Sequence, residues 1–124
     1  MKSNDFSKWA INYLKAAETL YKIENRTIGF WIPAYYLLHH SIELAIKAYI
    51  AKSTGSQPPK GHDIEKLFKN SSYSLTTDEG KAVQLLRQVN MGSGGLRYPQ
   101  VGTNGPFLPS MFNSGAKLVK KLIK

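Results

Sequence analysis

Residues 33–53, PAYYLLHHSIELAIKAYIAKS, are the stretch that decides the fold. Placed at 100° per residue, the apolar side chains cover most of a helix circumference, which is typical of a helix buried at the centre of a bundle. Pro33 suits the first position of such a helix, where its missing N–H removes no intrahelical bond. The apolar residues are Leu37, Leu38, Ile42, Leu44, Ala45, Ile46, Ala48 and Tyr49.

A narrow polar stripe interrupts this apolar surface. Tyr36, His40, Glu43 and Lys47 fall within about 60° of one another on the helix, and His39 lies on their flank. Glu43 and Lys47 stand four residues apart with Glu first, the favourable order for an ion pair. Because charges in a buried helix are costly to desolvate, the stripe indicates either a bonded structural network or a binding site. Both interpretations stay open at this point.

Helical patterns also flank the central stretch. In residues 5–23 the aromatic residues Trp9, Tyr13 and Tyr21 fall at helical spacing, and we assign them to the core. Thr76-x-x-Glu79 has the pattern of a capping box at the start of a helix. The expected helices cover 5–23, 33–53, a short segment capped by His62 or Asp63, a segment from the capping box to about Val89, and a segment capped by Ser110 near the C-terminus. The sequence therefore predicts an all-α protein, an up-down bundle of four to five helices.

Residues 90–109, NMGSGGLRYPQVGTNGPFLP, contain five Gly and three Pro and predict an irregular loop. A loop of this length within a compact domain is unusual and is often functional. With 124 residues, the chain has the length of one domain, which we place at 1–124.

The composition narrows the classes of function. Seventeen Lys and Arg against eight Asp and Glu give a net charge of +9, which favours anionic partners such as RNA or nucleotides but also suits a basic surface that serves solubility. There is no Cys, which excludes disulfides and thiolate metal sites. No apolar run is long enough to span a bilayer, and the first residues do not resemble a signal peptide. We therefore expect a cytoplasmic protein that does not bind membranes.

The basic residues near the stripe suggest an anion site. Lys47 can meet a phosphate while Glu43 holds its ammonium in place. His62 follows a loop that returns from the end of the Lys47 helix, and Arg97 can bind phosphate through its fork while Tyr98 stacks on a base. The alternatives are a structural Glu43–Lys47 pair, a capping role for His62 and a loop-anchoring role for Arg97. The candidate ligand-binding residues are Lys47, His62, Arg97, Tyr98, Glu43 and His40.

A metal site is the weaker interpretation of the stripe. His39, His40 and Glu43 have the helical spacing that can seat an ion. The pattern is not His-Glu-x-x-His, and the sequence has no second acidic cluster to complete a coordination shell. We therefore predict no metal and no other cofactor from the sequence.

Two segments carry a resemblance to a known family. Ile42-Glu43-Leu44-Ala45-Ile46-Lys47-Ala48 and Gly61-His62-Asp63-Ile64, within Pro33–Phe68, resemble the core of the HEPN domain (higher eukaryotes and prokaryotes nucleotide-binding), and Arg97-Tyr98-Pro99 resembles a further segment of one branch. The resemblance implies a four- or five-helix up-down bundle that dimerises. It also implies a cytoplasmic role in toxin–antitoxin, phage-defence or nucleotidyltransferase-associated systems.

The resemblance does not extend to the residues that cut RNA. Many HEPN proteins are metal-independent ribonucleases that use an Arg followed four to six residues later by a His. No His follows Arg26, Arg87 or Arg97 at that spacing. The chain therefore resembles a branch that lacks the ribonuclease motif, and we assign no catalytic residue.

Three hypotheses of function follow from these observations. The first is a non-catalytic HEPN-like module that binds a nucleotide or an RNA phosphate. The second is a protein-interaction subunit, paired with a nucleotidyltransferase or an antitoxin, whose basic charge faces an acidic partner. The third is an atypical ribonuclease that combines His62 with Arg97 from a separate segment.

We predict that the chain forms a homodimer, because the resemblance implies one and because the apolar stretch 28–32 needs cover beyond one small core. Light scattering at micromolar protein concentration should give twice the chain mass of 13.9 kDa. A mass near that of one chain would contradict the prediction and would leave the apolar stretch packed within a single chain.

Overall fold

The computed structural model describes residues 3–22, 28–91 and 109–124. These residues form α-helices joined by short irregular segments and contain no strand, which confirms the all-α prediction. The predicted loop at 90–109 lies outside the described residues except at its two ends, which belong to helices. The helices are α1 (Ser3–Tyr21), α2 (Ile28–Thr54), α3 (Ile64–Lys69), α4 (Thr77–Met91) and α5 (Pro109–Leu122).

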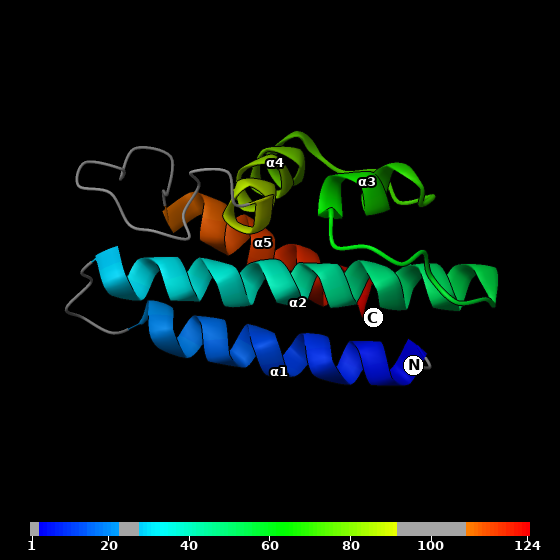
Figure 1. Ribbon diagram of the computed structural model, residues 1–124, viewed down its shortest axis with the longest axis horizontal. Helices are drawn as coiled ribbons and strands as arrows, with labels where there is room; N and C mark the ends of the chain where they lie inside the picture. The colour runs from blue at the N-terminus through cyan, green and yellow to red at the C-terminus, as the bar shows by residue number, and fades with distance from the viewer. Residues whose placement is uncertain (1–2, 23–27, 92–108) are drawn as a thin grey trace.

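Helix α2 is the central element of the bundle. It runs the length of the molecule with α1 antiparallel along one side, α3 and α4 on the other, and α5 passing behind it (Figure 1). It contacts each of the other four helices, and its contact with α1 is the most extensive between any two elements. This position explains why its sequence is apolar around most of its circumference.

The start of α2 differs from the sequence prediction. The helix begins at Ile28, so Pro33 lies inside it and is not its first residue. Pro33 cannot donate to the carbonyl of Gly29, and that is the one backbone bond its ring removes. The loss falls just after the first turn, whose N–H groups have no intrahelical partner in any case. A proline this near the N-terminus therefore does not end the helix.

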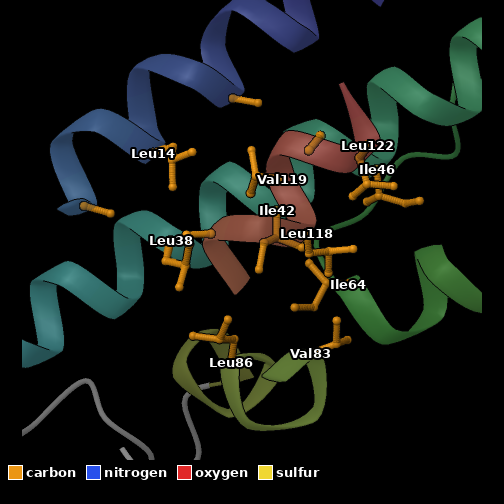
Figure 2. Close-up of a cluster of buried hydrophobic side chains, with 14 of the residues drawn as sticks. Leu14, Leu38, Ile42, Ile46, Ile64, Val83, Leu86, Leu118, Val119 and Leu122 are labelled. Atoms are coloured by element: carbon orange, nitrogen blue, oxygen red, sulfur yellow. The ribbon is translucent and has the colours of Figure 1, made fainter. Parts of the chain in front are cut away.

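The core lies between α2 and the helices around it. Figure 2 shows side chains from all the helices converging on Ile42 of α2. Ser41 adds a polar tie, because its hydroxyl donates to the carbonyl of Ala10 on α1 over 2.7 Å. Gly115 lets α5 approach closely, since a Cβ there would stand 2.9 Å from Cδ2 of Leu38. The labelled core residues are Leu14, Leu38, Ile42, Ile46, Ile64, Val83, Leu86, Leu118, Val119 and Leu122.

One core assignment from the sequence is wrong. Trp9 is 51% exposed, although its spacing placed it on the inner face of α1. It lies at the edge of the contact between α1 and α2, where its ring is tilted against that of Tyr13. Leu44 of α2 is also only partly buried. Helical spacing identifies the side of a helix that faces a partner, but it does not show where that contact ends.

Two helix starts follow the predicted capping chemistry. Asp63 caps α3, accepting the backbone N–H groups of Glu65 and Lys66 over 3.1 and 3.4 Å. Thr76 and Glu79 form the reciprocal capping box of α4, with bonds of 2.9 and 3.2 Å. The last helix begins at Pro109, one residue before the predicted cap Ser110, a difference within the ordinary uncertainty of a helix end.

None of the helices in the described ranges has the combination of length and apolar character that crossing a bilayer requires.

The burial of Ile42 generates a stability prediction. Ile42→Ala should lower the free energy of unfolding by about 2–5 kcal/mol, because it opens a cavity in a fully enclosed position. Leu44→Ala is the matched control on the same helix and should cost clearly less, since Leu44 is partly exposed. Urea unfolding followed by circular dichroism measures both. A loss below about 1 kcal/mol at Ile42 would mean that the core is misplaced.

Candidate functional site

Glu43 is the hub of the candidate site. It is a carboxylate on the central helix, only 4% exposed. Its Oε2 atom accepts two hydrogen bonds, one from Nζ of Lys47 over 3.1 Å and one from Nδ1 of His62 over 2.8 Å. Lys47 lies one turn further along α2, whereas His62 comes from the segment that precedes α3. The structure therefore brings together three of the predicted residues.

Local structure explains why His62 reaches the hub. Gly61, directly before it, has φ of +131°, a conformation that glycine adopts most readily. Asp63, directly after it, is fixed as the cap of α3 and accepts a bond from Nε of Arg87 on α4 over 2.9 Å. His62 thus lies between a glycine of positive φ and a capped helix start. The structure gives Arg87 a structural partner of its own.

The hub carboxylate is ionised at neutral pH. Burial by itself raises the pKa of Glu43, but the hydrogen bonds from His62 and Lys47 outweigh it and bring the pKa below its ordinary value. The side chain of Lys47 is 12% exposed and that of His62 is 72% exposed. The two basic groups therefore lie between the buried charge and the solvent.

The other side of the hub carries polar atoms without partners. Among the described residues, the Oε1 atom of Glu43 has no hydrogen-bond partner, and neither ring nitrogen of His39 has one. His39 is fully buried, and this burial lowers its pKa to about 4. Its ring is consequently neutral at pH 7. The sequence placed His39 on the flank of the stripe and gave no sign that it would be enclosed.

A hollow opens beside the hub on the α1 side. It has a volume of about 290 Å³ and is bordered by both α1 and α2. His40 stands at its wall with its ring stacked on that of Tyr13, the centroids 5.5 Å apart. The lining residues are Trp9, Tyr13, His40, Glu43 and Leu44. Sequence reasoning missed Trp9 and Tyr13 here, although their spacing of four residues places both on one face of α1.

Of the remaining predicted residues, one lies near the hub and two are outside the described part of the chain. His40 adjoins the hub through the hollow. Arg97 and Tyr98 lie outside the described residues, so their predicted roles stay predictions. The donor atoms of His39, His40 and Glu43 all lie within 4.8 Å of one another, as the helical spacing of the three residues leads one to expect.

The chain matches the family model of the HEPN domain over residues 4–123. It belongs to the HEPN domain family, which confirms the resemblance inferred from its two core segments. No curated protein and no solved structure matches the chain.

The burial of His39 generates a pH prediction. In the unfolded chain His39 binds a proton as the pH falls below its ordinary pKa of 6.5, whereas in the folded chain it resists protonation down to about 4. The contribution of His39 to the free energy of unfolding is therefore fully present above pH 6.5. It falls as the pH is lowered toward 4, by up to roughly 3 kcal/mol. Unfolding by urea at a series of pH values, with EDTA present, measures the loss.

His39→Leu is the variant that isolates this effect, because it removes the titrating ring and keeps an apolar side chain in the enclosed position. Its stability should vary less between pH 6.5 and 4.5 than that of the unaltered chain. Carboxylates with a lowered pKa, such as Glu43, lose their contribution to stability only below pH 4.5. They therefore do not affect the comparison between pH 6.5 and 4.5. The same slope in both proteins would contradict the assignment.

Proposed function

We propose that this HEPN chain is a non-catalytic module that binds a phosphate group of a nucleotide or of RNA at Lys47 and His62. The observation that carries the proposal is the convergence of these two side chains, from separate segments, on one oxygen of the buried Glu43. Glu43 holds both basic groups in place and faces no solvent itself. A phosphate would approach from the solvent side, where the basic groups are.

The N–H groups of Lys47 and His62 that do not bond Glu43 are suited to an anion. An ammonium has three N–H donors, and Glu43 takes one from Lys47. When Nδ1 of His62 donates to Glu43, its Nε2 atom carries a hydrogen only in the imidazolium form. In that form the ring offers a phosphate one N–H donor beside those of Lys47. The net charge of +9 adds a general attraction for anions.

The hollow beside Glu43 suits the base of a nucleotide. Trp9 and Tyr13 offer aromatic faces there, and Trp9 is half exposed. Stacking on aromatic side chains is tolerant of sequence and accounts for much of the affinity for single strands. We assign Arg97 to a second phosphate contact and Tyr98 to a further stacking contact, as the sequence predicts.

Several wider aspects of function belong to the same proposal. The lack of a His four to six residues after any Arg supports a role without RNA cleavage. The family resemblance supports a cytoplasmic setting in a toxin–antitoxin, defence or nucleotidyltransferase-associated system. A protein-interaction subunit is the second candidate, and the observation that favours it is the half-exposed Trp9 at the edge of the contact between α1 and α2.

Binding measurements test the proposal. Lys47→Met and His62→Gln should each weaken the binding of ATP or of a short single-stranded RNA by about tenfold, and Arg97→Ala should weaken it most because a forked contact is stronger than a point charge. The losses should shrink at high salt. Lys52→Met is the matched control, since Lys52 lies on the same helix and bonds only the carbonyl of Lys124 among the described residues. Fluorescence titration measures each affinity.

Two results would contradict the proposal. Unchanged binding in a stable Lys47→Met protein would make Glu43–Lys47 a structural pair and would move the function to a partner protein. Cleavage of the RNA probe that is lost in His62→Gln would instead identify an atypical ribonuclease.

A further inference from the structure

The unpartnered atoms around Glu43 point to a second kind of ligand. Both ring nitrogens of the fully buried His39 and the Oε1 atom of Glu43 have no hydrogen-bond partner in the described part of the chain. Buried polar groups are nearly always bonded, because leaving one unpaired is costly. A single ligand could satisfy one ring nitrogen of His39 together with Oε1 of Glu43, while the second ring nitrogen would remain without a partner.

Their arrangement on the helix is that of a ligand set. Glu43 follows His39 by four residues and His40 by three, so its carboxylate lies between the two rings on the surface of α2. The candidate donor atoms of the three residues lie within 4.8 Å of one another. Donors around a tetrahedral ion stand about 3.3–3.6 Å apart, given bonds of about 2.0–2.2 Å, so small rotations of the side chains bring them into range.

Within the described part of the chain, one oxygen of Glu43 is hydrogen-bonded and the other is without a partner, as in a carboxylate that ligates a metal. Oε2 accepts the bonds of Lys47 and His62, whereas Oε1 has no hydrogen-bond partner among the described residues. A ligating carboxylate is commonly held by hydrogen bonds to its other oxygen, which fix its orientation. Lys47 and His62 supply these bonds here.

We propose that His39, His40 and Glu43 bind one divalent ion of the zinc type. Two imidazoles and one carboxylate suit Zn²⁺, Co²⁺ or Ni²⁺, whereas Mg²⁺ and Ca²⁺ favour oxygen donors. Both His40 and Glu43 also line the hollow beside Trp9 and Tyr13. The hollow gives the ion a route in and leaves one coordination position for water or a small ligand.

The metal site and the anion site share Glu43 but use Lys47 differently. The ammonium of Lys47 lies 3.1 Å from Oε2 of Glu43, where it repels a cation and attracts an anion, and it also orients the carboxylate. Lys47→Met removes the repulsion together with the orienting bond, so it should leave Co²⁺ bound while it weakens nucleotide binding. One variant thus distinguishes failure of this inference from failure of the proposed function.

Titration of tag-free, EDTA-stripped protein with Co²⁺ tests the site, with visible absorption as the readout and Zn²⁺ as competitor. One ion should bind per chain with a dissociation constant below about 10 µM. His40→Gln and Glu43→Gln should each weaken binding by at least about tenfold. Glu18→Gln, at a partly exposed carboxylate on α1, is the control and should bind as the unaltered chain does. His62→Gln removes a bond that orients Glu43 and should lower the affinity, but the absorption band of bound Co²⁺ should keep its wavelength because the ring of His62 is not a ligand.

Three results would overturn the inference: no one-to-one binding by the unaltered chain, equal binding by a folded His40→Gln protein, or a changed wavelength of the Co²⁺ band in His62→Gln. Circular dichroism of each variant confirms that it is folded. Because His40 is only partly buried, its replacement is the variant least disruptive to the core.

Discussion

The carboxylate of Glu43 is a negative charge enclosed in the central helix, and the arrangement around it depends on keeping that charge bonded. A buried charge without partners is far more costly than a buried apolar group. Lys47 donates a hydrogen bond to this charge from the next turn of α2. His62 donates another from a segment nineteen positions after Glu43. The contact with His62 joins α2 to the segment that precedes α3. One ionised oxygen thus connects two parts of the chain that local patterns do not relate.

The two sides of this carboxylate have opposite chemical character. On the Oε2 side, two basic groups stand between the charge and the solvent, and we propose that they receive an anion. Oε1 has no partner among the described residues, and we propose that it receives a cation together with the rings of His39 and His40. An ion on one side changes the field felt on the other, so the two ligands would influence each other through Glu43.

Much of the fold could be predicted from the sequence because its signals are local. The apolar circumference of residues 33–53 identified the central helix, and the Thr76–Glu79 capping box fixed the start of α4. The start of α2 was misplaced because proline is read as a first residue, although one lost bond near a helix start is tolerable. Trp9 was wrongly assigned to the core because helical spacing shows which side of α1 faces α2 but not where the contact between the helices ends.

The candidate site was less predictable for a different reason. Glu43, Lys47 and His40 share one stripe of one helix, so their spacing reveals them. The bond between His62 and Glu43 depends on the path of the chain after α2, which local patterns do not specify. The complete enclosure of His39 depends on how the neighbouring helices pack against α2, and a flanking position on a helical wheel does not show it.

Helix α2 serves the core with Leu38, Ile42 and Ile46 and serves the candidate site with residues interleaved among them. Turning a helix by one residue rotates every side chain by about 100°. No adjustment of α2 can therefore improve one face without moving the other. In a redesign of this protein, a shift of α2 that changes core packing would therefore also change the geometry of the ligand site. New specificity is easier to build on α1, which borders the hollow with Trp9 and Tyr13 but holds no part of the hub.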